Sequence, residues 1–259
     1  MSTVVQLRGV RVGAGRVTIA ASLTSDTPTG LDSEAGRLVA MAAELAEWRA
    51  DYLLAAYPDH PLDEVPGRLR ARLGTMPLLA TVRSDTEGGQ VRLTDPQYAA
   101  HATTLLRAGD VDAIDLELAR GPVLPELTAQ AREADVRVVI SQHHVTGTPP
   151  AGRLVDQLEQ MARAGADIAK VAVTAHGPQD VLELLTATTR AAAELTIPVV
   201  TMAMGPAGLV SRLCGEVFGS SITFGAVDRA SAPGQVDIDR LRDVVQIVHE
   251  HGHPAPGSE

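Results

Sequence analysis

The residue with the most distinctive chemistry in this sequence is Lys170. It is the only lysine in the chain, and the other 21 of the 22 basic residues are arginines. The run that contains it, residues 164–173, is apolar and rich in β-branched side chains, a composition that predicts a buried strand. Burial or neighbouring cations can remove the proton of a lysine near neutral pH, and the neutral amine then attacks a carbonyl carbon to form a Schiff base. We predict that Lys170 is a covalent catalyst.

His143 is the candidate for proton transfer, because the pKa of a free imidazole, about 6.5, suits it to both accept and donate a proton. It ends a predicted strand two residues after Ser141, and the two side chains therefore share a face. Polar side chains that point into the protein interior cost free energy unless they pair with one another or take part in binding or catalysis. We therefore expect groups of opposite charge around Lys170 and His143. The other inward side chains at the ends of predicted strands are Glu47, Arg49 and Asp51, then Thr81, Arg83 and Asp85, then Asp115 and Glu117, and later Met202 and Met204.

The elements that would position these residues alternate between strand and helix. Eight βα units predict a (β/α)8 TIM barrel, in which catalytic groups gather at the carboxyl ends of the strands. A doubly wound open sheet is the alternative, but the nearest glycine pattern, residues 205–208, lacks the spacing of a nucleotide fingerprint. The predicted strands are residues 17–23, 45–53, 77–83, 113–118, 137–143, 167–173, 198–204 and 221–227.

Helix signals and the chain ends complete the expected organisation. An N-terminal β-hairpin is expected within about residues 3–16, with a turn at Arg8-Gly9, and residues 252–259 are expected to form a disordered tail. We expect residues 1–251 to fold as one domain, since no linker or change of composition interrupts them. The clearest helices are residues 95–108, with Asp95 as cap, residues 180–194 and residues 237–251.

Composition excludes several classes of function. A net charge of −10 and an aromatic content of 2% argue against nucleic acid, since phosphates require basic tracts and bases require aromatic rings. The single cysteine, Cys214, cannot form an internal disulfide, which is typical of a reducing compartment. No signal peptide and no run of membrane-spanning length is evident. We expect a cytoplasmic protein that binds no membrane.

At these residues the sequence resembles the type I 3-dehydroquinate dehydratases over nearly its whole length. Each motif is weak alone, but their occurrence together and in order is highly specific. The motifs are Glu47-Trp48-Arg49-Ala50-Asp51, Arg83 with Glu87-Gly88-Gly89, Asp115-Leu116-Glu117-Leu118, Ser141-Gln142-His143, Ala166-Asp167-Ile168-Ala169-Lys170, Thr201-Met202-Ala203-Met204, Ser211-Arg212-Leu213, Thr223-Phe224-Gly225-Ala226-Val227 and Ala230-Ser231-Ala232-Pro233-Gly234-Gln235.

The resemblance implies a shikimate-pathway enzyme that dehydrates 3-dehydroquinate to 3-dehydroshikimate through a Schiff base. It implies that Lys170 forms the imine, that His143 moves protons and that Glu87 orients the imidazole. It further implies a homodimer that needs no metal and no cofactor. Two departures from the family flank the histidine, at His144 and Val145. The residues expected to bind the substrate are Ser22, Glu47, Arg49, Arg83, Met202, Arg212, Ser231 and Gln235.

Other interpretations of the same residues stay open at this point. Glu87 could be an ordinary loop acid, Arg212 a surface helix residue, and residues 231–235 an ordinary βα loop instead of a lid over the substrate. A class I aldolase-type lyase would also use a strand lysine, and a non-catalytic sensor of shikimate metabolites would use the same binding residues. A metal-dependent isomerase is disfavoured, because His143 and His144 would face opposite sides of a strand.

Overall fold

Eight parallel strands form a nearly closed barrel in the computed structural model, which describes residues 4–227 and 232–252. The hydrogen-bonded order is β10-β3-β4-β5-β6-β7-β8-β9, and a bridge between Val199 and Ser220 links the two ends of this order. The predicted (β/α)8 barrel is therefore confirmed. The strands are β3 (Thr18–Leu23), β4 (Leu45–Arg49), β5 (Leu78–Thr81), β6 (Ala113–Glu117), β7 (Arg137–His144), β8 (Ile168–Thr174), β9 (Val199–Met204) and β10 (Ile222–Gly225).

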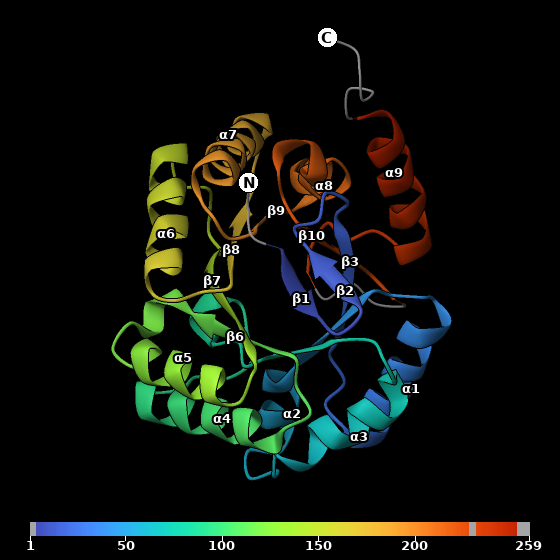
Figure 1. Ribbon diagram of the computed structural model, residues 1–259, viewed down its shortest axis with the longest axis vertical. Helices are drawn as coiled ribbons and strands as arrows, with labels where there is room; N and C mark the ends of the chain where they lie inside the picture. The colour runs from blue at the N-terminus through green and yellow to red at the C-terminus, as the bar shows by residue number, and fades with distance from the viewer. Residues whose placement is uncertain (1–3, 228–231, 253–259) are drawn as a thin grey trace.

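Helices surround the ring and connect successive strands (Figure 1). The α-helices are α1 (Pro28–Ala40), α2 (Ala50–Ala56), α3 (Glu64–Leu73), α4 (Asp95–Ala108), α5 (Leu124–Glu133), α6 (Ala151–Arg163), α7 (Pro178–Glu194), α8 (Leu209–Leu213) and α9 (Ile238–His251). Short 3₁₀ turns lie in the connections at η1 (Asp85–Glu87), η2 (Leu118–Arg120), η3 (Pro206–Gly208) and η4 (Gly215–Phe218).

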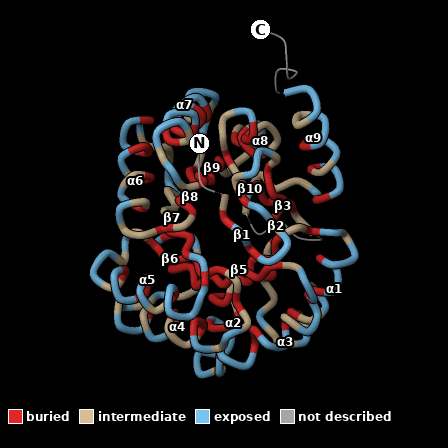
Figure 2. Tube along the Cα trace, viewed as in Figure 1, coloured by how far each residue is buried: buried red, intermediate tan, exposed pale blue. Residues whose placement is uncertain are grey.

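The alternation of side chains along each strand divides the core into two layers. Val139 and Ala172 point into the barrel, whereas their neighbours Ile140 and Val171 pack between the sheet and the helices. Both layers are buried, and the exposed residues follow the outer sides of the helices and the loops (Figure 2). The strands thus give a rigid frame whose inward positions at one end are available for polar side chains.

The predicted N-terminal hairpin is present as β1 (Val5–Leu7) and β2 (Val10–Val12), which pair antiparallel around the turn at Arg8-Gly9. Its apolar side chains join the interior cluster formed by residues at the amino ends of the strands. Arg8, in a left-handed conformation with φ of 47°, pairs with Asp112 just before β6 at 2.7 Å. The hairpin lies across the middle of the ring (Figure 1) and closes its amino end, which leaves the carboxyl end for ligands.

The predicted end of the second strand and the predicted cap of α4 were wrong, and most other boundaries differ from the structure by one or two residues. The strand expected over residues 45–53 ends at Arg49, and Asp51 lies in the first turn of α2, because Ala50, Leu53 and Leu54 are buried with helical spacing. The cap of α4 is Thr94 and not Asp95. Thr94 forms a capping box with Gln97, a reciprocal arrangement that satisfies two backbone donors at once. The helix predicted over residues 237–251 is α9, which begins at Ile238 and has Asp237 as its cap.

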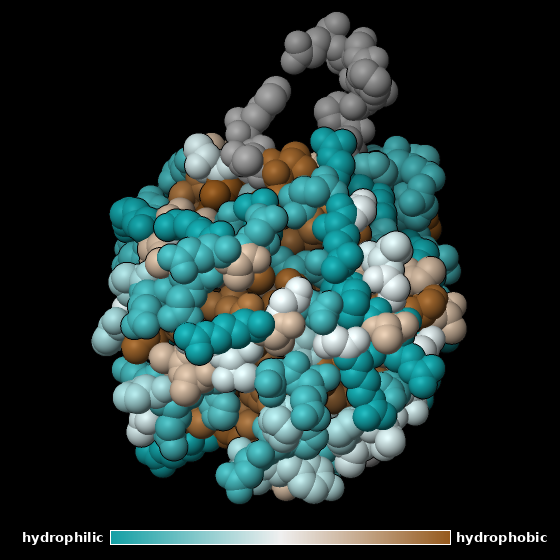
Figure 3. Space-filling model, turned by 60° about the horizontal axis from the view of Figure 1, so that its bottom comes forward, coloured by the Kyte–Doolittle hydropathy of each residue, from teal (hydrophilic) through white to brown (hydrophobic). Residues whose placement is uncertain are grey.

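In the part of the chain that the structure describes, no helix combines the length and the apolar character that a bilayer crossing needs. Figure 3 shows a face that is mostly hydrophilic, with hydrophobic residues in small separate patches. The predicted disordered tail falls almost entirely on residues 253–259, which lie outside the described residues.

Candidate active site

A cavity of about 350 Å³ lies at the carboxyl ends of the strands. Its lining combines charged groups low in the barrel with apolar and small residues nearer the solvent, such as Val145 and Pro233. Of the residues predicted as site residues, Ser231 lies outside the described residues. The structure brings the other ten to the cavity wall: Ser22, Glu47, Arg49, Arg83, Glu87, His143, Lys170, Met202, Arg212 and Gln235.

Lys170 occupies an inward position of β8 and is 4% exposed. Its Nζ lies 3.3 Å from Oε1 of Glu47 and 3.2 Å from Oδ2 of Asp115. The amine also sits over the ring of Phe224, 5.0 Å from the centroid. Two carboxylates and one aromatic face therefore hold the amine at a fixed position in a dry part of the barrel.

The two acids beside Lys170 are themselves fixed by neighbouring strands. Glu47 accepts a hydrogen bond from Oγ of Ser22 at 2.7 Å, and Asp115 accepts one from Oγ of Ser141 at 2.6 Å. Burial raises the pKa of Glu47, but Lys170, Arg49 and the hydrogen bond from Ser22 together outweigh it, and the pKa is lowered. Burial likewise raises the pKa of Asp115, but Arg83 and Lys170 outweigh it. Both acids are anions at neutral pH.

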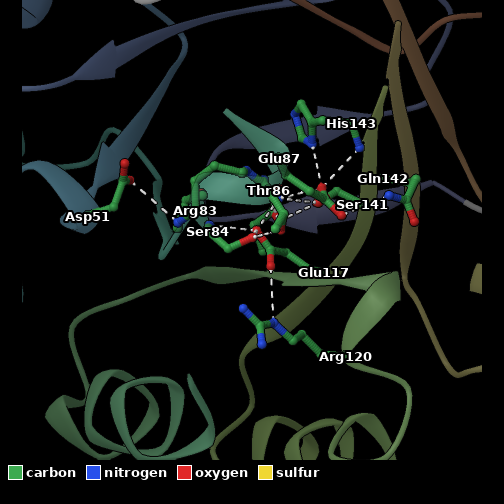
Figure 4. Close-up of polar contacts among 12 residues, drawn as sticks. Asp51, Arg83, Ser84, Thr86, Glu87, Glu117, Arg120, Ser141, Gln142 and His143 are labelled. Carbon is green, nitrogen blue, oxygen red and sulfur yellow. Dashed lines mark hydrogen bonds and ion pairs between the residues drawn. The ribbon is translucent and has the colours of Figure 1, made fainter. Parts of the chain in front are cut away.

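Arg83 links the carboxylates across the barrel. Its Nη2 donates to Asp115 at 2.7 Å, and its Nη1 lies 3.2 Å from Glu117 and 3.3 Å from Glu87. Burial lowers the pKa of Arg83, but the three carboxylates raise it well above its usual value. Although Arg83 lines the cavity, it first serves to hold these acids together, as Figure 4 shows for Glu87 and Glu117.

The loop that carries Glu87 folds over the ends of β6 and β7. Gly89 allows the fold, since a Cβ at this position would lie 1.9 Å from the carbonyl oxygen of Arg83. Glu117 accepts hydrogen bonds from the backbone nitrogen and the hydroxyl of Ser84, at 2.8 and 2.9 Å, and so fixes the start of the loop. The loop is therefore built to place one carboxylate, that of Glu87, at the end of β7.

The buried carboxylate of Glu87 pairs with the partly buried imidazole of His143. Oε2 of Glu87 lies 3.1 Å from Nδ1 of His143 and accepts the backbone N–H of the same residue at 2.9 Å (Figure 4). Burial raises the pKa of Glu87 to about 8. Burial also holds the pKa of His143 well below its usual value, and Arg83 and Lys170 add to this effect. The imidazole is therefore neutral near pH 7.

Arg49 is set at the wall by Asp51, which is fully buried. The carboxylate takes two hydrogen bonds from the guanidinium, from Nε and Nη2, both at 2.8 Å. It also accepts the backbone N–H of Gln90 at 3.0 Å, which ties the loop of Glu87 to α2. The motif that spans residues 47–51 thus places Glu47 and Arg49 from β4 and Asp51 from α2, and its three charged residues do not share one strand face.

Arg212 is a buried cation that pairs with no carboxylate in the part of the chain that the structure describes. It is 2% exposed, and its Nε and Nη2 have no hydrogen-bond partner among the described residues. Nη1 contacts only the sulfur of Met202, at 3.8 Å. Burial lowers the pKa of Arg212 to about 10. An anionic group in the cavity would supply the missing partner.

Sequence reasoning gave no role to two residues that the structure places at the site. Phe224 faces Lys170 because β10 is in register with β3 and alternation turns this ring inward, a signal that the predicted strand already contained. Gln142 contacts Glu87 because the loop after β5 brings Glu87 to the end of β7. The alternation of side chains along a strand does not predict such a contact. Of the two departures, His144 bonds to Gln157 of α6 at 2.9 Å, and Val145 is 40% exposed at the rim.

The geometry defines a class of protein: a (β/α)8-barrel enzyme with a buried amine and an acid–base pair at the carboxyl ends of its strands. Among residues 4–227 and 232–252, no group of three or more histidine, cysteine or acidic side chains is arranged to hold a metal ion.

Comparison with known proteins then gives the family. The model of the type I 3-dehydroquinase family matches residues 19–252, and the chain belongs to this family. It is 40% identical to the 3-dehydroquinate dehydratase of Salmonella agona over 248 residues, 95% of this chain and 98% of that one. The structure of the 3-dehydroquinate dehydratase from Geobacillus kaustophilus has a TM-score of 0.92 and 36% identity, over 97% of this chain and 98% of that one. The type I enzyme from Clostridium difficile with covalent modified comenic acid also has a TM-score of 0.92, with 35% identity over 96% of this chain and 99% of that one.

Proposed function

We propose that this protein is a hydro-lyase that converts 3-dehydroquinate to 3-dehydroshikimate and water through an imine on Lys170. The observation that carries the proposal is that one cavity contains the buried amine, the Glu87–His143 pair and the unpaired cation of Arg212. A keto acid with a β-hydroxyl group requires these three functions: an electron sink, a proton carrier and a partner for the carboxylate.

The first stage forms the electron sink. After Lys170 has lost a proton, Nζ attacks the ketone carbon, and loss of water from the resulting carbinolamine gives a protonated imine. Glu47 and Asp115, at 3.3 and 3.2 Å from Nζ, stabilise the positive charge that the imine nitrogen carries. The imine withdraws electrons from the adjacent carbon more strongly than the ketone does.

The second stage eliminates water. His143 removes a proton from the carbon next to the imine, and the electron pair moves toward the nitrogen to give an enamine. The electrons then return and expel the β-hydroxyl group, which leaves as water with a proton from His143. Hydrolysis of the conjugated imine consumes the water released in the first stage, frees Lys170 and gives the enone, so that the net reaction loses one water.

The other residues of the cavity wall orient the substrate. The guanidinium of Arg212 pairs with the substrate carboxylate, and this contact satisfies donors that are otherwise buried alone. We include Ser231 in the set from the resemblance to the family alone. The other residues that contact the substrate in this proposal are Ser22, Glu47, Arg49, Arg83, Met202 and Gln235, all on the cavity wall.

We further propose that residues 1–251 fold as one domain and that the protein is a cytoplasmic homodimer. The family resemblance supports the dimer, and the single cysteine, Cys214, which is free, supports a reducing compartment. Sedimentation equilibrium of the full chain tests the assembly, and a mass equal to one chain would contradict it.

Borohydride trapping during turnover tests the chemistry. Reduction should fix the substrate or product to the protein, and peptide mapping should place the adduct on Lys170, because the chain has no other lysine. Lys170→Arg is the matched control, since it keeps the charge but cannot lose its proton near neutral pH. It should bind the substrate and fail to form the enone, which is followed by ultraviolet absorbance. Substantial activity in Lys170→Arg would rule out the imine.

A further inference from the structure

Glu87 is held at the end of β7 by hydrogen-bond donors from two consecutive residues. Nε2 of Gln142 donates to Oε1 of Glu87 at 2.8 Å. The backbone N–H of His143 and its Nδ1 both lie against Oε2, at 2.9 and 3.1 Å. One strand therefore contacts both oxygens of the carboxylate, as the close-up shows (Figure 4).

The position of Gln142 follows from strand alternation and from the loop. Ser141 and His143 point into the barrel, so Gln142 points outward, on the side where Ile140 packs against the helices. The loop after β5 crosses the end of β7, and Glu87 therefore straddles the strand. Its carboxylate meets the imidazole on the inner side and the amide of Gln142 on the outer side.

The amide of Gln142 determines where the proton of the pair can lie. Among the described residues, Gln142 is the only hydrogen-bond donor to Oε1, and Glu87 is only 4% exposed, so water has little access to this oxygen. The N–H that Gln142 donates to Oε1 stabilises the ionised carboxylate of Glu87, whose Oε2 lies against Nδ1 of His143. When Glu87 is ionised, Nδ1 keeps the ring hydrogen, and Nε2 is the basic nitrogen.

We propose that Gln142 is a positioning residue of the reaction, whose amide fixes the Glu87 carboxylate so that His143 presents Nε2 to the substrate as a base. The inference rests on the proposed roles of Glu87 and His143. Gln142 acts through these residues and does not touch the substrate.

Loss of this amide has a predictable direction. A hydrogen bond to a carboxylate favours its ionised form, so removing the donor favours protonated Glu87. A protonated Glu87 donates to Nδ1 and leaves the ring hydrogen on Nε2, which is then no base. The charged or titratable groups that face the pair are Arg83, Glu117, Asp115, Lys170, Arg49 and His144.

The experiment measures kcat/KM against pH in Gln142→Met, which keeps the length of the side chain but not the donor. We expect the acidic limb of the profile to move up by about one pH unit, and kcat/KM at pH 7 to fall about tenfold. Borohydride capture on Lys170 should remain. The matched control is Gln157→Met, which removes an amide that contacts His144 on the outer side of β7, and its profile should match the wild type.

Three results would overturn the inference. One is a profile of Gln142→Met that superposes on that of the wild type. Another is a Gln142→Met protein whose kcat/KM falls by the same factor at every pH, whose acidic limb does not move and whose melting temperature is lower. That result would make Gln142 a merely structural residue. The third is an unchanged His143 tautomer in Gln142→Met at pH 7, read from ¹⁵N-histidine spectra in which His143 is assigned by its absence in His143→Ala. Wild-type turnover in His143→Ala would instead refute the proposed acid–base role itself.

Discussion

Replacement of Arg212 by methionine should weaken substrate binding strongly without weakening the fold. The reason is that this guanidinium is buried and that two of its nitrogens have no hydrogen-bond partner within residues 4–227 and 232–252. Lowering the pKa of Arg212 from 12.5 to about 10 corresponds to about 3 kcal/mol of folding free energy. Methionine fills much of the same volume and carries no charge.

The sign of the effect on stability follows from the direction of the shift. Arg212 is a cation whose pKa is lowered on folding, so below about pH 10 the folded state holds its proton at a cost that the unfolded state does not have. At pH 7 that whole cost is present in the free enzyme. We therefore expect the melting temperature of Arg212→Met to equal or exceed that of the wild type when no ligand is bound.

The effect on binding has the opposite sign, because a substrate carboxylate satisfies the unpaired donors. Removing one partner of a buried charge pair costs on the order of 2–5 kcal/mol, so KM should rise roughly 30-fold or more. The assay is the ultraviolet absorbance of the enone product over a wide range of substrate concentration. Arg190→Met, an exposed arginine of α7, is the control and should leave KM unchanged.

A ligand that lacks the carboxylate makes the test specific. Such an analogue should bind wild type and Arg212→Met with similar affinity, since neither complex contains the charge pair. If KM for the substrate were unchanged while the melting temperature fell, Arg212 would be a structural residue and the proposed orientation of the substrate would be wrong.

Three further predictions concern the acid–base pair and the frame. His143→Ala should lower kcat by about 10²–10⁴ and still form the Lys170 adduct, and wild-type kcat would refute the assignment. The free enzyme should show an acidic limb in kcat/KM at about pH 8, where Glu87 ionises. Glu87→Gln should move that limb below the usual pKa of histidine, because only His143, whose pKa burial holds low, then titrates; a limb still near pH 8 would contradict this. Thr94→Ala should remove the capping box of α4 and cost about 1 kcal/mol, or about 2–4 °C in melting temperature, with kcat unchanged; an unchanged melting temperature would show that the cap contributes nothing.

Much of the fold could be predicted from the sequence, because strand and helix in a βα barrel have different periods. The predicted strand over residues 167–173 differs from β8 by one residue at each end. The error at residues 45–53 has a local cause: polar residues alternate at 47, 49 and 51, and this pattern imitates a strand beyond its true end. Burial of Leu53 and Leu54 in the helical layer decides the structure, and that burial is a tertiary property.

The site could be predicted in part for the same reason. Inward positions on strands follow from alternation, so Lys170 and His143 could be placed on the barrel wall in advance. Contacts made by loops could not be placed, because a loop can cross its neighbours in several ways. The approach of Glu87 to Gln142 depends on the turn at Gly88-Gly89 and on Glu117 holding Ser84, and neither contact has a periodic signal.

The distribution of charge explains why so many buried ions are tolerated beside one amine. Burial of a lone ion is costly, whereas Arg83 shares its guanidinium among Asp115, Glu117 and Glu87. This sharing leaves Asp115 able to contact Lys170 through its other oxygen, so the amine has a second carboxylate beside that of Glu47. Arg212 breaks the pattern, since its guanidinium has no carboxylate partner among the described residues. The positive charge of Lys170 is therefore paired within the protein, whereas that of Arg212 has no partner among the described residues. A substrate carboxylate can then form the missing ion pair when it binds.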